Sequence, residues 1–124
     1  MICRSLTPGV GVVCTVFEGS QSIEAGGVWN IEVDCQYICK EHDIQITSDI
    51  PDILFTLYIH NGVEYIKHVK IGERTLIETV NEEGKTRYFG NIYFINILGK
   101  TKLVIQNTSS EKTANIVVKW VCKS

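Results

Sequence analysis

Residues branched at Cβ dominate this sequence and limit the folds that it can adopt. The 124 residues include 17 Ile, 13 Val and 10 Thr, but only 2 Ala and 6 Leu. Branched side chains pack well on a pleated sheet, whereas Ala and Leu favour helices. The composition therefore argues against a helical bundle and predicts an all-β fold.

Alternation of apolar and polar residues with a period of two locates the strands. We expect strands over residues 9–17, 28–34, 43–47, 53–60, 63–71, 75–80, 88–98, 102–108 and 114–122, with a turn at 18–20. Eight or nine short strands at this spacing predict a single-domain antiparallel β-sandwich, jelly-roll-like, over residues 9–124, with residues 1–8 as an N-terminal arm. The inward-facing positions predict a core of Trp29, Ile31, Val33, Ile44, Ile46, Phe55, Leu57, Ile105, Ile116 and Val118.

The dipeptide Asn61-Gly62 is the clearest turn signal in the sequence. Asn-Gly suits a two-residue type I′ turn, in which both residues have positive φ. Such a turn closes a hairpin between residues 53–60 and 63–71 and places Tyr58 directly opposite Tyr65.

A face of this hairpin carries the candidate binding residues. Tyr58 and Tyr65 lie opposite the expected core face, with Thr56 and Lys67 beside them. If that face is exposed, a pair of tyrosines with a cation and a hydroxyl forms a patch suited to a ligand or a protein partner.

Charge and hydropathy exclude several classes of partner. The formal net charge is −2, from 12 basic and 14 acidic residues, and no apolar run approaches the ~18 residues of a membrane span. We therefore expect no nucleic-acid partner and no membrane insertion. No signal peptide is evident, so we expect an intracellular or particle-associated protein. The tripeptide Asn107-Thr108-Ser109 fits the N-glycosylation pattern, but without a leader we interpret it as a hairpin corner.

No group of residues in the sequence has the pattern of a catalytic site. There is no Gly-x-Ser-x-Gly motif, and His60 and His68 lie on opposite strands of the expected hairpin without a partner motif. We therefore predict a protein that is not an enzyme and that needs no cofactor.

The cysteines leave a metal site as an alternative. Cys35, Cys39 and His42 have the spacing of a zinc corner, to which Cys14 or Cys122 would add a fourth ligand. No second closely spaced pair accompanies them, so we expect ordinary thiols or a disulfide and no metal. The total of five cysteines is odd, which leaves one thiol free or intermolecular if the others pair.

Several segments together resemble known β-sandwich modules. They are Gly26-Gly27-Val28-Trp29-Asn30-Ile31-Glu32-Val33, Asp43-Ile44-Gln45-Ile46, Phe55-Thr56-Leu57-Tyr58-Ile59 and Leu103-Val104-Ile105-Gln106-Asn107-Thr108. Their order is similar to that of GOLD-type and pre-peptidase C-terminal modules, and viral capsid accessory sandwiches share it. The resemblance implies binding and assembly roles rather than catalysis, and it assigns no functional residue.

The first expected strand suggests how such a protein would associate. Residues 9–17 carry no charge, and an uncharged strand at a sheet edge favours pairing with a neighbour. The candidate interface residues are Cys3, Val10, Val12, Cys14 and Val16. We therefore predict a self-associating or partner-bound structural protein, such as a virion or particle-surface component. The alternative is a ligand-binding sandwich for a carbohydrate or a secretory cargo.

Overall fold

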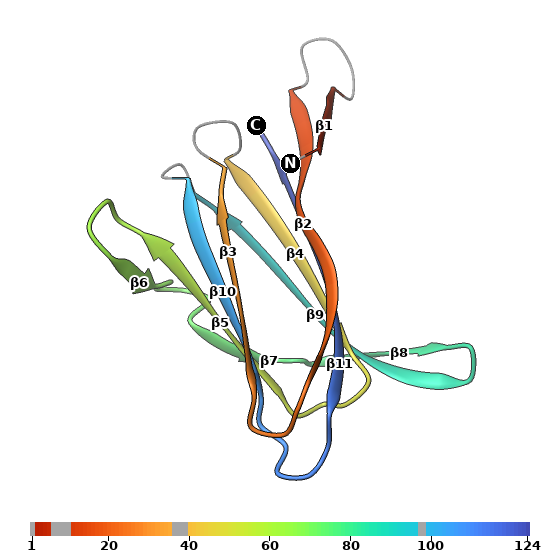
Figure 1. The fold of residues 1–124 in the computed structure, drawn as a ribbon. Helices are drawn as coiled ribbons and strands as arrows, with labels where there is room; N and C mark the ends of the chain where they lie inside the picture. Colours follow the sequence, from red (N-terminus) through yellow and green to blue (C-terminus); the bar gives the residue numbers. More distant parts are fainter. Residues whose placement is uncertain (1, 6–10, 36–39, 97–98) are drawn as a thin grey trace.

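Two β-sheets packed face to face make up the protein (Figure 1). The computed structural model describes residues 2–5, 11–35, 40–96 and 99–124, and these contain eleven strands and no helix. The strands are β1 (Ile2–Ser5), β2 (Val12–Ile23), β3 (Val28–Asp34), β4 (Glu41–Ser48), β5 (Ile53–His60), β6 (Tyr65–Lys67), β7 (Glu73–Thr75), β8 (Glu78–Glu82), β9 (Lys85–Ile95), β10 (Lys100–Asn107) and β11 (Ala114–Lys123).

The strand order is that of a jelly roll. One sheet runs β1-β2-β11-β4-β9-β8 and the other runs β3-β10-β5-β6, with β7 also paired to β5. Every pair is antiparallel. Without β1, β7 and β8, two four-stranded sheets remain, and the chain crosses between them at almost every connection. The predicted antiparallel sandwich is thus confirmed, and the short β1 and β7 bring the strand number above the eight or nine expected.

The predicted core positions form the interior between the two sheets. Nine of the ten are buried, because alternate residues of each strand face the opposing sheet. Trp29 is the exception, since it is only partly buried and packs edge to face on Phe17 at 5.9 Å between ring centroids. Trp120, at the centre of β11, is fully buried and is the largest side chain of the core.

The turn expected at residues 18–20 is wrong. Strand β2 continues through these residues to Ile23 and pairs with β11 along its length. A Cβ at Gly19 would lie 3.0 Å from Cζ of Phe17, so the glycine gives room for that ring within a continuous strand. A register shift between Trp120 and Val121 leaves Val16 without an opposite residue, which is the signature of a β-bulge.

The hairpin at Asn61-Gly62 exists, but its register is not the one predicted. Gly62 has a φ of 99°, whereas Asn61 does not have positive φ. The side-chain Oδ1 of Asn61 accepts hydrogen bonds from the N–H groups of Val63 and Glu64, both at 2.9 Å. This side-chain turn lengthens the loop to residues 61–64, so Tyr65 pairs with His60 instead of Tyr58.

The return strand of that hairpin is also shorter than predicted. Only Tyr65–Lys67 forms a strand, because the chain turns at residues 68–71. The turn is fixed to β5, since His68 N donates to the carbonyl of Leu57 at 2.8 Å and Leu57 N donates to the carbonyl of Gly72 at 3.1 Å. The second sheet therefore ends in a short strand and a loop beside β9.

Strands β8 and β9 form a hairpin whose tip extends away from the sandwich (Figure 1). Its turn contains Glu83 and Gly84, both with positive φ. All five residues of β8 are exposed. Residues 36–39 lie outside the described residues, and residues 41 and 42 belong to β4.

Candidate functional site

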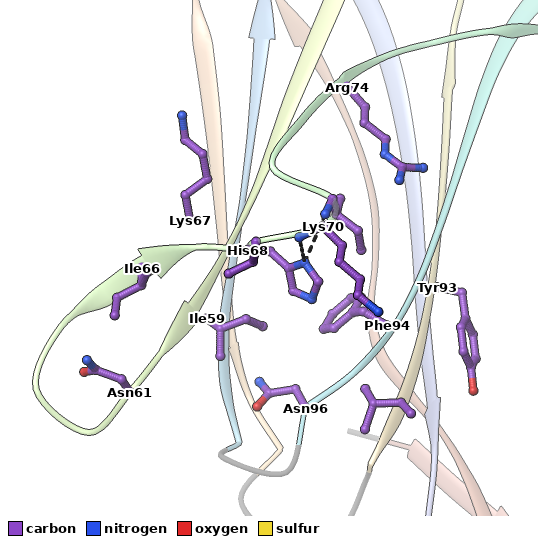
Figure 2. A pocket seen from close by; sticks show the side chains of 13 residues that line it. Ile59, Asn61, Ile66, Lys67, His68, Lys70, Arg74, Tyr93, Phe94 and Asn96 are labelled. Carbon is purple, nitrogen blue, oxygen red and sulfur yellow. Dashed lines mark hydrogen bonds between the residues drawn. The ribbon is translucent and has the colours of Figure 1, made fainter.

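A cleft of about 750 Å³ lies where the edges of the two sheets face each other. Strand β6 and the 68–71 turn form one wall, and the end of β9 forms the other (Figure 2). The side chains that line it are Ile59, Asn61, Ile66, Lys67, His68, Val69, Lys70, Ile71, Arg74, Tyr93, Phe94, Ile95 and Asn96. A cleft of this size accommodates a ligand the size of a typical drug or metabolite.

Large apolar side chains reach solvent at this cleft. Val69 is 96% exposed, Ile95 63%, Tyr93 56% and Ile66 46%. Single exposed apolar residues are ordinary, but a cluster of them around a cleft is typical of a binding surface. The sequence analysis assigned no function to these four residues. They belong to two separate segments, 66–69 and 93–95, and no sequence pattern shows that the fold brings these segments together.

Aromatic rings form a rigid floor beneath the cleft. The ring of Phe94 stacks on the imidazole of His42 at 4.8 Å between centroids, and both meet Trp120 edge-on. The indole Nε1–H of Trp120 donates to Nδ1 of His42 at 3.0 Å. Burial lowers the pKa of His42 to about 4, so its imidazole is neutral at pH 7. Next to this floor, Asn96 is buried and its Nδ2 donates to Oγ1 of Thr101 at 2.7 Å.

The 68–71 turn fixes His68 in one tautomer. Its Nδ1 accepts hydrogen bonds from the backbone N–H of Lys70 at 3.2 Å and of Ile71 at 3.1 Å. A nitrogen that accepts carries no proton, so the proton of the neutral ring is on Nε2. Burial, followed by the charges of Lys70 and Arg74, lowers the pKa of His68, which favours this neutral form.

Within the described part of the chain, the lining of the cleft contains basic side chains and no carboxylate. Lys67 forms an ion pair with Glu73 at 2.9 Å and extends away from the cleft (Figure 2). Lys70 and Arg74 form no ion pair with any of the described residues. The local charge is therefore positive, although the chain as a whole has a net charge of −2.

The predicted tyrosine patch lies on another surface, the outer face of the second sheet. Tyr58 and Tyr65 remain on one face despite the register change, because a shift of two residues preserves the side. The ammonium of Lys102 lies 4.9 Å from the ring centre of Tyr58 and 4.7 Å from that of Tyr65. Lys67 pairs with Tyr58 in the strand register, whereas Thr56 is buried.

The predicted interface residues surround the first disulfide. Cys3 on β1 is bonded to Cys14 on β2. Cys14 is fully buried, and Val12 and Val16 pack against the core. Strand β1 pairs with β2 along Val12–Thr15, so the sheet edge at this point is β1 itself. Val10 lies outside the described residues.

The proposed metal ligands do not form a cluster among the described residues. Nδ1 of His42 already accepts from Trp120. Cys35 is a buried free thiol, and burial, helped by Asp34, raises its pKa to about 11. Cys122 is disulfide-bonded, and Cys39 lies outside the described residues. Within residues 2–5, 11–35, 40–96 and 99–124, no three potential metal ligands come together.

Two other sequence signals have structural roles. His60 accepts a hydrogen bond at Nδ1 from the N–H of Gly62 and so supports the hairpin loop. Asn107 is fully buried, and its Nδ2 donates to the carbonyls of Ile23 at 2.9 Å and Lys112 at 2.8 Å. The amide nitrogen that a glycan would need is therefore inaccessible in the folded protein. The described residues also contain no helix that could span a membrane.

Comparisons with known proteins identify no family. No protein-family model matches the sequence, and no curated protein matches it. Among solved structures, the mannan-recognising carbohydrate-binding module TmCBM27 is similar, with a TM-score of 0.49, 10% identity, and coverage of 92% of this chain and 74% of that one. The Caldicellulosiruptor saccharolyticus module CBM27-1, in complex with mannohexaose, has a TM-score of 0.48, 12% identity, and coverage of 94% and 76%.

A family GH115 4-O-methyl-α-glucuronidase, BtGH115A, also matches, with a TM-score of 0.48 and 13% identity. The match covers 82% of this chain but only 14% of that enzyme. None of these three is a GOLD-type, pre-peptidase or capsid module. Because identities are 10–13% and TM-scores lie below 0.5, the similarities do not indicate what this chain binds.

Proposed function

We propose that this chain is a non-catalytic ligand-binding jelly-roll domain whose ligand occupies the cleft between β6 and β9. One observation carries the proposal: four large apolar side chains, exposed by 46–96%, line a single cleft of about 750 Å³. Burying such side chains against a ligand is favourable by about 25 cal/mol per Å² of apolar surface. The stack of Phe94 on His42 is buried and already formed without a ligand, so it supports the cleft and binding does not require the core to rearrange.

The groups around the cleft favour binding over catalysis. His68 uses one ring nitrogen to hold its own turn, and Asn96 is engaged with Thr101 and the carbonyl of Lys100. Among the residues that the structure describes, no serine, cysteine or carboxylate lines the cleft as a nucleophile or general base. The chemistry available there is apolar contact, hydrogen bonding and positive charge.

A fluorescent apolar probe tests this function. We expect N-phenyl-1-naphthylamine, which is uncharged, to bind wild-type protein with saturation at one site. Replacing Ile66→Ser and Ile95→Ser together weakens this binding by about tenfold, because two apolar contacts are lost. The control is Val117→Ser, since Val117 is 50% exposed but lies on β11, away from the cleft. No saturable binding, or an equal loss in the control, contradicts the proposal.

A second candidate function is carbohydrate binding on the tyrosine face. Tyr58 and Tyr65 share Lys102. Burial, followed by the charges of Glu32 and Asp34, raises the pKa of Tyr65, which places both carboxylates near its ring. Aromatic rings beside charged hydrogen-bonding groups suit a sugar, which presents both apolar faces and hydroxyls.

A panel of immobilised glycans, probed with wild-type and Tyr65→Ala protein, tests the second candidate. Binding that Tyr65→Ala abolishes and Tyr93→Ala leaves unchanged supports the tyrosine face. Binding lost with Tyr93→Ala instead places the sugar in the cleft, and the absence of any bound glycan contradicts this candidate.

A further inference from the structure

We propose that the cleft selects an amphiphilic ligand, in which an apolar body carries a single anionic group such as a carboxylate or sulfonate. The anion lies against Lys70 and Arg74, and the apolar body extends along Ile66 and Ile95. This inference rests on the proposed ligand-binding function and deepens it by naming the class of ligand.

Charge complementarity is the first support. Lys70 and Arg74 are both exposed and line the cleft, and neither has an ion-pair partner among the residues that the structure describes. Their charges both act on His68, because they contribute to lowering its pKa. Two cations close to one histidine create a positive potential that an anionic group would neutralise.

Two carboxylates whose partners border the cleft, Glu73 and Glu41, do not cancel this potential. Glu73 is held by Lys67 at 2.9 Å, outside the cleft lining. Glu41 bonds to Lys123 at 3.2 Å and is also hydrogen-bonded to the phenol of Tyr93. Each carboxylate thus already has a cationic partner other than Lys70 or Arg74.

His68 supplies a hydrogen-bond donor in the same cleft as the two cations. Its Nδ1 is occupied by the N–H groups of Lys70 and Ile71, so Nε2–H is the free donor of the ring. Figure 2 shows this second nitrogen directed into the cavity, toward Phe94. A neutral N–H with two cations nearby is a suitable arrangement for one carboxylate or sulfonate group.

The apolar lining determines the rest of the ligand. Below the cations, the cleft is bounded by Ile59, Ile66, Ile95 and the ring of Phe94. These side chains offer no hydrogen bonds to hydroxyl groups, so a ligand rich in hydroxyls would lose its water without replacement. An aliphatic or aromatic body matches this lining, and a cationic ligand would be repelled by it.

Two matched probes test the inference. The first, 8-anilinonaphthalene-1-sulfonate, is N-phenyl-1-naphthylamine with an added sulfonate. At low ionic strength we expect wild-type protein to bind the sulfonate probe about tenfold more tightly than the uncharged one. Replacing Lys70→Gln and Arg74→Gln together should remove this preference, while leaving binding of the uncharged probe within about twofold of wild type. That unchanged binding also shows that the variant remains folded.

The control variant carries the same charge change elsewhere. Lys85→Gln and Arg87→Gln lie on the β8–β9 hairpin, outside the cleft lining. We expect this variant to keep the tenfold preference. A third variant, His68→Asn, keeps an acceptor for the turn but loses Nε2–H. We expect it to bind the sulfonate probe several-fold more weakly than wild type does, and the uncharged probe with almost unchanged affinity.

The outcomes separate the two proposals. If both probes bind the cleft with equal affinity, or the control variant loses the preference as well, the anionic selectivity is wrong and the ligand-binding function stands. If neither probe binds, or if Ile66→Ser with Ile95→Ser changes nothing, both proposals are wrong.

Discussion

The buried histidine under the cleft makes the stability of the fold depend on pH. His42 is fully buried, stacks on Phe94 at 4.8 Å and accepts the indole N–H of Trp120 at 3.0 Å. Burial lowers its pKa from 6.5 to about 4, and the nearby backbone of Asn96 opposes the shift only in part. The imidazolium form would lose the bond to Trp120, because a protonated Nδ1 does not accept.

The direction of the effect follows from which state takes up the proton first. The folded-state pKa of His42 is lower than the unfolded one, so the unfolded chain binds more protons between pH 6.5 and pH 4. The contribution of His42 to stability is complete above pH 6.5 and is lost as the pH falls through this window. At 1.36 kcal/mol per pKa unit, the loss from pH 7 to pH 4 is about 3 kcal/mol.

Urea unfolding at pH 7.5, 6.5, 5.5 and 4.5 measures this effect. Some carboxylates also lose stabilising contacts in acid. Glu41 is one of them, because its hydrogen bond to Lys123 lowers its pKa in the folded protein. We therefore compare wild type with His42→Gln, which removes the titrating group but keeps an acceptor. The variant is less stable at pH 7.5, and its free energy of unfolding should fall less steeply between pH 6.5 and pH 4.5. Parallel pH profiles for the two proteins would refute the assignment.

Three further predictions test the fold by urea unfolding at neutral pH. Gly90→Ala should cost about 1–3 kcal/mol, because a Cβ there would lie 2.8 Å from Cδ2 of Leu76; an unchanged midpoint contradicts this packing. Gly62→Val should cost about 1 kcal/mol or more through its φ of 99° alone, since nothing lies within 4 Å of the added Cβ; a neutral substitution contradicts the loop conformation. Cys3→Ser should cost about 2–3 kcal/mol by releasing the link to Cys14, and reductant should then have no further effect on this pair.

Much of the fold was predictable because burial in a sandwich follows strand alternation. Ile44 and Ile46, or Phe55 and Leu57, face the interior simply because they are two residues apart in strands with one buried side. The errors arose where side chains changed the backbone. The Asn-Gly dipeptide predicts a loop of two residues. In the structure, the side chain of Asn61 accepts two backbone hydrogen bonds and so lengthens this loop.

The candidate site was less accessible to sequence reasoning. Its two walls, β6 with the 68–71 turn and the end of β9, come from different sheets, and no local pattern links them. One signal was present: the segment from Ile66 to Ile71 contains three basic residues among three apolar ones and does not alternate strictly, as a strand with one buried face would. The role of His68 in the turn depends on hydrogen bonds that only the folded backbone reveals.

For the tyrosine patch, the prediction that Tyr58 and Tyr65 share a face is correct, although the strand register on which it was based is wrong. The expected register placed Tyr58 directly opposite Tyr65, whereas the structure places them diagonally around Lys102. Both registers leave the rings on one face, because side chains alternate with a period of two. Whether this face binds anything remains a prediction.

Mapping a bound probe residue by residue tests the central claim most directly. In a ¹H–¹⁵N correlation spectrum titrated with 8-anilinonaphthalene-1-sulfonate, we predict that the largest shifts fall on the amides of residues 66–71 and 93–96, the two walls of the cleft. Shifts centred instead on Tyr58, Tyr65 and Lys102, or spread evenly over both sheets, would contradict a ligand site between β6 and β9.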